Sequence, residues 1–345
     1  MRRQLEEAVL PAIVALLIAM VVGDVLILSF GQSPGTVYRL LIEGTWGNAY
    51  GLGQVLYKTT TLTFTGLAIA LGLRAGLFNI GAESQLAAGG FVAALVGLVL
   101  PAGLNPLVTL PLFIVAAAAG GAAVGAVPGA LKAKFGAHEV IVTIMLNYIV
   151  LALLNYFVAV HLKVEGTLHT KEIHSGALPR LSDFISAFHG SAANVVLLLA
   201  LLAAALVRGY LFRTRRGFEL RATGLQPAAA EYAGVNVRAV WLNTMILSGA
   251  IAGIGGLNFV LGYKHYYEDA FASGAGFVGI AVAIVGRNHP VGVVLAALVF
   301  ATMSQGGLAV NAVVPKQIVD VLQAVVIIAV AASVPEVRRM LRRSR

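Results

Sequence analysis

The sequence contains no cysteine, and only 11% of its 345 residues are charged. The absence of cysteine excludes disulfides, cysteine-ligated zinc and thiol catalysis. The shortage of charge excludes a water-soluble globular protein, in which about 25% of the residues are charged. Hydrophobic residues make up 59% of the chain, and the mean hydropathy is +0.89. These proportions predict an all-α fold, a polytopic transmembrane helical bundle.

Motifs for catalysis are also missing. The chain has no GxxxxGK[ST] phosphate loop, no HExxH and no GxSxG, so ATP hydrolysis by a phosphate loop is excluded. Four of the seven histidines fall at irregular spacing in one stretch, residues 161–191, which is typical of a solvated loop and not of a metal site. Buried carboxylates and histidines, which a proton-coupled carrier needs, are few. We therefore expect a protein that is not an enzyme and holds no cofactor or metal.

Apolar stretches long enough for membrane helices recur along the chain. A transmembrane helix needs about 20 apolar residues. The candidate spans are residues 8–30, 54–73, 78–100, 107–131, 140–160, 192–212, 239–261, 274–286, 291–310 and 318–334. The first lacks a convincing cleavage site and is expected to stay on the protein as a span. The sequence therefore predicts about ten spans, one of them short or broken.

The short span is residues 274–286, which has 13 residues and four glycines. A helix of that length rises about 20 Å, whereas the hydrocarbon core is about 30 Å thick. Short or glycine-broken segments often mark a transport path. A short core helix inside a packed bundle explains the segment equally well, so both interpretations stay open.

The distribution of basic residues predicts the orientation. With ten crossings and a cytoplasmic N-terminus, 17 of the 24 lysine and arginine residues lie on the inner side, as the positive-inside rule requires. We expect a multi-pass protein of a bacterial plasma (inner) membrane with both termini cytoplasmic and in contact with membrane lipid. The net charge of +9 is explained by this topology, so no nucleic-acid partner is expected.

Small residues recur at four-residue spacing in two spans. Gly121, Gly125 and Gly129 form one such face, and Gly249 with Gly253 forms another. This pattern lets helix backbones approach closely in a membrane. We expect these glycines to pack helices and not to bind a solute.

Polar side chains inside the spans are the candidates for a translocation path. One group is Asn79, Glu83 and Gln85, at the start of a span; the other is Asn147 and Asn155, which are eight residues apart and share one helix face. Glu83 near a helix start favours capping and an interaction with the helix dipole over contact with a solute. A membrane asparagine usually bonds another helix. Lining a path for a small polar solute is the alternative for all five.

One basic segment, residues 213–238, lies between two apolar stretches. Gly217, Gly224 and Gly234 allow sharp turns in it, and Pro227 suits the first position of a short helix. A polar, glycine-hinged element of this kind is typical of a region presented to a cytoplasmic partner. An ordinary connecting loop carrying positive-inside charge is the alternative.

Four stretches together resemble a known family. They are LRAGLFNIGAESQLAAGGF, KFGAHEVIVTIMLNYI, GFELRATGLQPAAAEYAGVNV and GFVGIAVAIVGRNHPVGVVLAALVF. In this order, over about residues 59–332, they resemble the ABC-transporter permeases for branched-chain amino acids and simple sugars, in the branch that takes up nucleosides or simple sugars.

The resemblance implies partners for the chain. It implies a pore formed with a second, homologous permease, ATP-binding cassette subunits on the cytoplasmic side and an extracytoplasmic solute-binding lipoprotein that delivers a nucleoside. It also implies that the segment 213–238 couples to the cassette, although its AAAEYAG fits the EAA-type motif of other importers only in part. The coupling residues would be Glu219, Arg221, Gly224, Glu231 and Gly234.

Alternatives remain for both the solute and the mechanism. A simple sugar or a branched-chain amino acid can replace the nucleoside, and a self-sufficient membrane carrier can replace the ABC importer. Aromatic rings and amides would suit a nucleoside, and the sequence candidates are Tyr148, Tyr156, Phe78, Asn79 and Asn147. We expect an N-terminal span and outer segment over residues 1–53, a permease domain 54–334 with an outer loop 161–191, and a basic tail 335–345.

Overall fold

The computed structural model describes residues 17, 18, 20–315 and 317–329. Over these residues the structure is helical and contains no β-sheet, only isolated bridges that join Lys163 to Thr170, His169 to Glu268 and Arg180 to Asn194. The chain divides into two compact units. One comprises Leu56–Ala297, and the other comprises Met1–Val55 with Leu298–Arg345.

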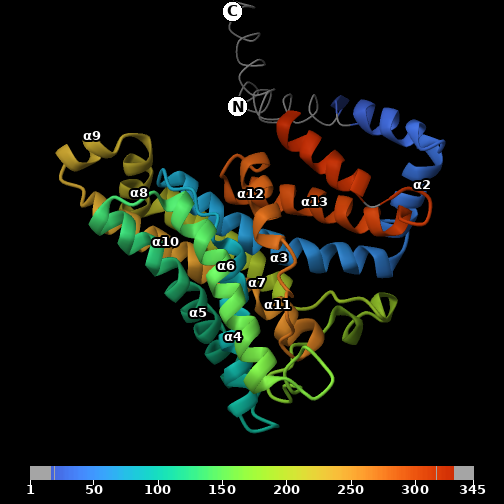
Figure 1. Ribbon diagram of the computed structural model, residues 1–345, viewed down its shortest axis with the longest axis horizontal. Coiled ribbons are helices and arrows are strands. Elements are labelled where there is room, and N and C mark those ends of the chain that lie inside the picture. Colours follow the sequence, from blue (N-terminus) through green and yellow to red (C-terminus); the bar gives the residue numbers. More distant parts are fainter. Residues whose placement is uncertain (1–16, 19, 316, 330–345) are drawn as a thin grey trace, which may run out of the picture. The chain divides into compact units, whose positions relative to one another are not determined.

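The helices follow one another through short connections, with a single long loop after α6 among the described residues (Figure 1). Their bounds are α2 (Pro34–Thr45), α3 (Ala49–Arg74), α4 (Ala82–Val99), α5 (Pro106–Phe135), α6 (Glu139–Phe157), α7 (Val196–Arg213), α8 (Arg215–Leu225), α9 (Pro227–Tyr232), α10 (Val237–Gly255), α11 (Leu257–Phe259), α12 (Ala275–Val285) and α13 (Pro290–Val310). Two π-helical turns, η1 (Val158–Leu162) and η4 (Val260–Lys264), extend α6 and α11, and two 3₁₀ turns, η2 (Leu181–Asp183) and η3 (Ser186–Phe188), lie in the long loop.

Six helices of the described region are long and apolar enough to cross a membrane by length and composition. They correspond to the predicted spans that begin at residues 78, 107, 140, 192, 239 and 291. Helix α3 is 26 residues long but less apolar, because it carries Lys58 and a run of threonines. The segments Met20–Ser29, Ala275–Val285 and Gln317–Ala329 are apolar helices of 10–17 residues. About half of the first predicted span and the end of the last lie outside the described residues, and the count of ten is not confirmed.

Within the unit Leu56–Ala297, helices α5 and α10 pack through the glycine faces that the sequence predicted. A Cβ atom on Gly249 would collide with the carbonyl oxygen of Gly121, and one on Gly125 would collide with that of Met245. Helix α4 joins the same interface, since a Cβ on Gly89 would meet the backbone of Gly253. The packing role of these glycines is confirmed, and the structure adds that the two faces contact each other.

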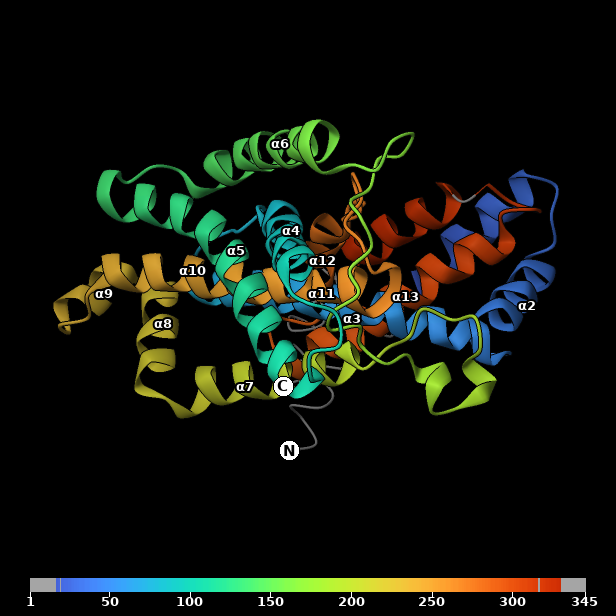
Figure 2. The same ribbon diagram turned by 90° about the horizontal axis from the view of Figure 1, so that it is seen from below.

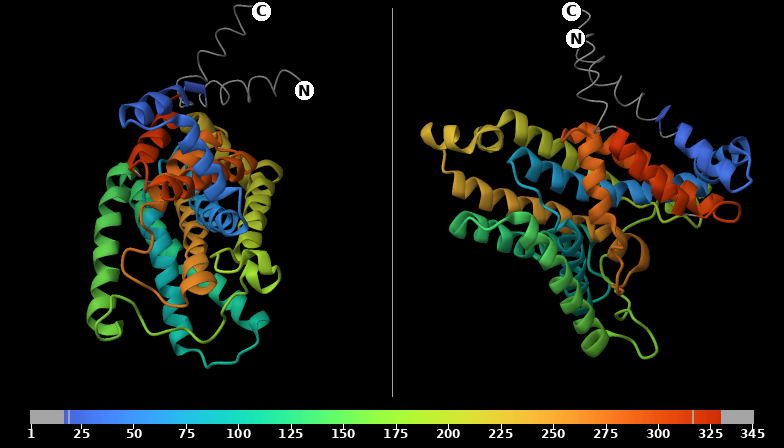
Figure 3. Two further views of the ribbon diagram at one scale, coloured as in Figure 1. Left: turned by 90° about the vertical axis from the view of Figure 1, so that its right-hand side faces the viewer. Right: turned by 45° about the horizontal axis from the view of Figure 1, so that its top comes forward.

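The two ends of this unit differ in structure. The short helices α8 and α9 lie at one end, beyond the ends of α7 and α10, and the long loop after α6 lies at the other, as the views in Figures 1, 2 and 3 agree. The loop is fastened to its end of the bundle by backbone bonds from Ile173 to His265 and from Leu178 to Leu261. The loop and the α8–α9 hairpin therefore lie at opposite ends of this unit.

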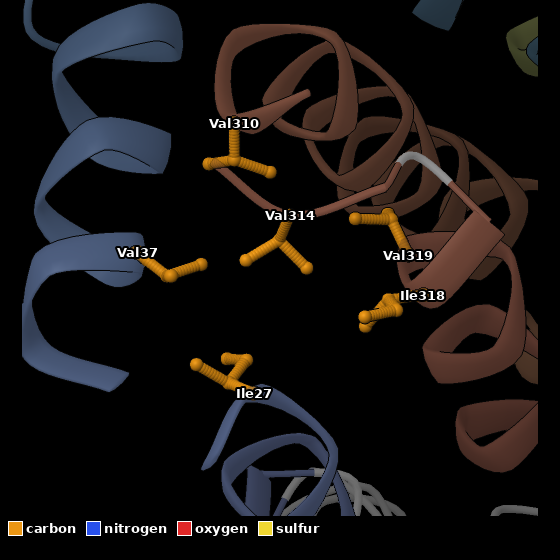
Figure 4. Close-up of a cluster of buried hydrophobic side chains, with 6 residues drawn as sticks. All are labelled: Ile27, Val37, Val310, Val314, Ile318 and Val319. Carbon is orange, nitrogen blue, oxygen red and sulfur yellow. The ribbon is translucent and has the colours of Figure 1, made fainter. Parts of the chain in front are cut away.

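The other unit has its own apolar core. Figure 4 shows six side chains that point toward one another from α2, the end of α13, the segment after it and the helix around Ile27. They are Ile27, Val37, Val310, Val314, Ile318 and Val319. Asp24, the single acid of the predicted span 8–30, accepts a hydrogen bond from the Tyr38 hydroxyl at 2.8 Å. A structural partner therefore accounts for this carboxylate.

Candidate functional site

Asn79 and Gln85, two of the predicted path residues, are fully buried and bond to each other at the start of α4. The Asn79 Nδ2 group donates to Gln85 Oε1 and to Ser248 Oγ, each at 2.8 Å, and Gln85 Nε2 donates back to Asn79 Oδ1 at 3.1 Å. The Ser248 hydroxyl in turn donates to the carbonyl of Ala68 in α3. The amides therefore join α3, α4 and α10 through hydrogen bonds that replace lost hydration.

Asn147 joins α6 to the same region. Its Oδ1 accepts from the backbone N–H of Ser84 at 3.2 Å, and its Nδ2 donates to the carbonyl of Ile80 at 2.9 Å. Both backbone groups belong to the first turn of α4 and the loop before it, where helical partners are missing. The expectation that this asparagine bonds another element is confirmed.

Glu83 lies in the first turn of α4, as predicted, but its carboxylate caps a different helix. Its Oε1 and Oε2 accept hydrogen bonds from the backbone N–H groups of Gly274 and Gly276, at 2.7 and 2.5 Å, where α12 begins. Gly276 must be glycine, because a Cβ there would collide with Glu83. A carboxylate at a helix N-terminus satisfies free donors and offsets the positive end of the dipole. Glu83 therefore fixes the start of the short span.

Asn155 and the predicted tyrosines are placed differently from this cluster. Asn155 lies two turns beyond Asn147 and is partly exposed, while Tyr148 is 74% and Tyr156 58% exposed. Only 11% of this span is buried, and its buried face carries Glu139, Thr143 and Asn147, so the two tyrosines point outward. The structure thus brings together four of the five predicted path residues and separates Asn155 from them.

Replacing Asn147 by leucine is expected to destabilise the protein. The substitution leaves the N–H of Ser84 and the carbonyl of Ile80 without their asparagine partner, which costs about 1–3 kcal/mol for each buried group. The thermal midpoint of the purified protein, followed by size-exclusion chromatography after heating, measures the loss. Asn155→Leu, on the same helix but partly exposed, is the matched control and should be close to wild type. Equal midpoints for the two variants would contradict the assignment.

The segment 213–238 forms the α8–α9 hairpin. Thr214 caps α8 by accepting from the N–H of Gly217 at 3.0 Å, and the predicted start of a helix at Pro227 is confirmed. Gly234 ends the hairpin with φ of +86°, in the left-handed region that favours glycine. Glu219 pairs with Arg215 at 2.9 Å on the surface, and Glu231 is exposed.

Two predicted coupling residues face the body of the unit instead of solvent. A Cβ on Gly224 would collide with the carbonyl of Arg74 at the end of α3. The guanidinium of Arg221 lies 5.2 Å from the centre of the Phe212 ring, and Arg74 lies 5.8 Å from the same ring. Arg74 also donates to the carbonyl of Asn288 at 2.8 Å, in the turn between α12 and α13. Arg221 and Gly224 therefore hold the hairpin on the bundle.

Sequence reasoning missed the apolar outer surface of the hairpin. Phe218, Leu225 and Tyr232 are 62%, 85% and 97% exposed. These three large apolar side chains are therefore the most exposed ones on an otherwise polar element. Their alternation with charged residues between 213 and 238 is the signal that could have revealed them.

A second buried polar group, also missed, joins α3, the start of α7 and α11. Asn258 donates to Thr61 Oγ1 at 2.8 Å and to the carbonyl of Tyr57 at 2.9 Å, and Asn194 donates to Asn258 Oδ1 at 2.9 Å. The ring of Tyr57 lies 5.3 Å from that of Tyr263. Aromatic rings and amides therefore meet here, far in sequence from the tyrosines of α6.

The comparison with protein families decides the class of this chain. Residues 51–331 match the family described as branched-chain amino acid transport system / permease component. The chain belongs to this permease family. It is thus a membrane protein and an ABC permease component, a transport subunit and not an enzyme.

Three relatives resemble the permease over most of their length. It is 37% identical to the guanosine ABC transporter permease protein NupP of Bacillus subtilis, over 96% of this chain and 95% of the relative. It is 33% identical to the nucleoside ABC transporter permease protein NupB of Lactococcus lactis, over 94% and 90%. It is also 33% identical to the glucose ABC transporter permease protein TsgB13 of Haloferax volcanii, over 92% and 85%. No solved structure matches the permease.

Proposed function

We propose that the permease carries nucleosides into a bacterial cell as the membrane subunit of an ATP-driven importer. The observation that carries this proposal is the similarity, over at least 90% of both chains, to two permeases named for guanosine and nucleosides. A simple sugar is the second candidate, because the glucose permease is as similar to the chain as the second of these. The nucleoside is preferred because the more similar relative is named for guanosine.

The α8–α9 hairpin would be the contact with the ATP-binding cassette. The hairpin exposes the large apolar side chains of Phe218, Leu225 and Tyr232, and Glu231 and Gly234 are exposed as well. Apolar anchors with a polar rim are typical of protein interfaces.

The inner residues of the hairpin would pass on the movement of a docked cassette. Arg221 and Gly224 would transmit it to α3 and the α12–α13 turn, because they hold the hairpin against the end of α3. Glu219 would orient the rim of the contact surface through its pair with Arg215.

The hairpin would lie in the cytoplasm, with both termini, and the loop of residues 161–191 outside. The opposite positions of hairpin and loop in the unit support this orientation, as does the excess of basic residues on the hairpin side. A second, homologous permease would complete the pore, ten spans would cross the membrane in this chain, and a solute-binding lipoprotein would dock on the outer side.

The polar cluster of Asn79, Glu83, Gln85 and Asn147 would lie beside the path and hold its helices together. Its polar atoms supply hydrogen bonds to one another and to the ends of α4 and α12. Asn155 would lie further along α6. A path that opens by moving α12 would have to release the Glu83 carboxylate from the start of that helix.

Co-purification followed by uptake measurement tests the proposal. The tagged permease, isolated in mild detergent, should carry an ATP-binding cassette and a second permease, identified by mass spectrometry. Proteoliposomes that contain this complex and the solute-binding protein should accumulate guanosine only when ATP is supplied on the cassette side. Accumulation by the permease alone would instead support a self-sufficient carrier. Glucose accumulation without guanosine accumulation would favour the sugar.

A further inference from the structure

The loop after α6 contains a pocket of about 570 Å³, within the range of small-molecule sites, roughly 300–1,000 Å³. Its wall is formed by residues 177–180, 182–183 and 189–190 of the loop, and His265 closes it from the segment after η4. Asp183 and Ser182 supply a carboxylate and a hydroxyl, and Arg180 and His189 supply nitrogen donors. The pocket thus offers both donors and acceptors to a neutral polar molecule.

His265, which lines this pocket, also has a buried ring nitrogen without a partner in the described part of the chain. Its Nδ1 is shielded from solvent and has no hydrogen-bond partner among the described residues. Burial lowers the pKa of the His265 imidazole, and the charge of Arg180 adds to the effect. The ring is therefore neutral near pH 7 and adds no charge to the wall of the pocket.

Arg180 separates the pocket from a group of aromatic rings. Its guanidinium lies 5.7 Å from the centre of the Tyr263 ring and donates to the Tyr263 carbonyl at 2.6 Å. Tyr263 lies 5.3 Å from Tyr57 of α3 and 6.3 Å from Phe259. The Lys264 ammonium lies 5.4 Å from the centre of the same Tyr263 ring, so a planar base that stacks on this ring would displace one of the two cations.

The amides beneath these rings hold them in place. Asn258 bonds the carbonyl of Tyr57, and Asn194 lies against Gly262, where any Cβ would collide with its carboxamide. The two asparagines bond each other at 2.9 Å. They therefore fix the backbone of both tyrosines relative to each other.

The segment that carries Tyr263 has backbone features that often accompany function. Tyr263 lies in the π-helical turn η4, a rare form that recurs at functional sites. His265, Ala270 and Ser273 follow with φ of +60°, +55° and +43°, which is strained for residues with a side chain. A regular helix end whose role is only to pack against its neighbours lacks these features.

We infer that the pocket of Arg180, Asp183 and His265 receives a nucleoside on its way into the permease, and that Tyr263 then stacks on its base. Nucleobases stack on aromatic side chains, and polar pocket groups suit the sugar hydroxyls. This inference rests on the proposed function and assigns its first binding step to this chain.

Uptake by the full importer in proteoliposomes tests the role of Tyr263. Tyr263→Leu should lower kcat/KM about tenfold or more, and more for a purine than for a pyrimidine nucleoside, because the larger base loses more stacking. Tyr263→Phe should restore uptake. Tyr266→Leu is the matched control, because the Tyr266 ring stacks on that of His169, with 4.3 Å between their centres, in the same segment. An equal loss for both nucleosides, or no loss, would overturn the assignment.

Labelling of a single cysteine gives a measurement that does not depend on the folding of the tyrosine variant. The chain has no cysteine of its own, so Ser182→Cys introduces one thiol at the pocket and Ser186→Cys one in the same loop outside its lining. Guanosine should slow maleimide labelling at position 182 and leave position 186 unchanged. If guanosine does not slow labelling at position 182 in a complex that imports guanosine, the inference about the pocket is wrong and the proposed function still stands. A wild-type complex that imports no nucleoside would overturn the proposed function as well.

Discussion

Arginine in place of Gly234 should reduce ATP-driven uptake to background while the permease remains folded and inserted. Gly234 is exposed, and no other atom lies within 4 Å of the place that a Cβ would occupy, so a side chain would not collide with the bundle at that atom. Its φ of +86° makes a side chain cost about 1–2 kcal/mol locally. The new cation would stand beside Tyr232 and Glu231, in the surface proposed for the cassette. Uptake and the amount of cassette that co-purifies measure the effect.

A matched control separates the coupling surface from backbone strain. Gly103, in the loop between α4 and α5, has φ of +84° and equally open surroundings. Gly103→Arg therefore adds the same charge and the same strain, but after the C-terminal end of α4. This position is remote from the place where Gly224 of the hairpin contacts the end of α3. We expect normal uptake and normal cassette binding. If Gly234→Arg also imports solute normally, the hairpin does not couple to a cassette.

Much of the helix pattern can be predicted from the sequence, because hydropathy and helix-start residues are local properties. The start of α9 at Pro227, the short helix of residues 275–285 and the close-packing glycines all follow from nearby residues. The number of membrane spans is harder to predict. Helix α3 mixes threonines with leucines, and three apolar helices are too short to be counted by length.

Long-range partners cannot be predicted in the same way. The position of Glu83 predicts a helix cap, yet its carboxylate serves the start of α12, which is 191 residues away along the chain. Likewise, glycines at four-residue spacing, around Gly121 in one helix and around Gly249 in another, indicate two close-packing faces. The pattern does not show that these two faces contact each other, since any small-residue face fits another. Local patterns indicate which kind of interaction a residue can make, and the tertiary structure determines which residue is its partner.

Aromatic residues illustrate the same limit. Tyr148 and Tyr156 suit a nucleoside path by sequence, because they stand near asparagines. The polar residues Glu139, Thr143 and Asn147 recur every four positions and form the buried face of α6, and the two tyrosines fall outside that face. The structure turns these rings outward and instead gathers Tyr57, Phe259 and Tyr263 beside buried amides. The chemistry expected for a path is therefore present in the chain, but its position depends on the fold.

The second large effect is expected at the interface of α5 and α10. Gly249→Leu should prevent these helices from closing, because the new Cβ meets the carbonyl oxygen of Gly121 and no flexible side chain can move aside. Overpacking of a core typically costs about 1–3 kcal/mol, and here the backbones of two helices must separate. We expect loss of monodisperse protein in detergent, or a sharply lowered thermal midpoint by size-exclusion chromatography after heating.

Gly209→Leu provides the control for this substitution. Gly209 lies inside the apolar helix α7, and nothing lies within 4 Å of the position of its Cβ. The two variants therefore gain the same helix propensity and the same apolar volume, and differ only in whether another backbone occupies the space. Since Gly121 is already the smallest residue, no substitution on α5 can compensate. If both variants are equally stable, α5 and α10 do not pack through these glycines, and the contact that organises the α4, α5 and α10 group must lie elsewhere.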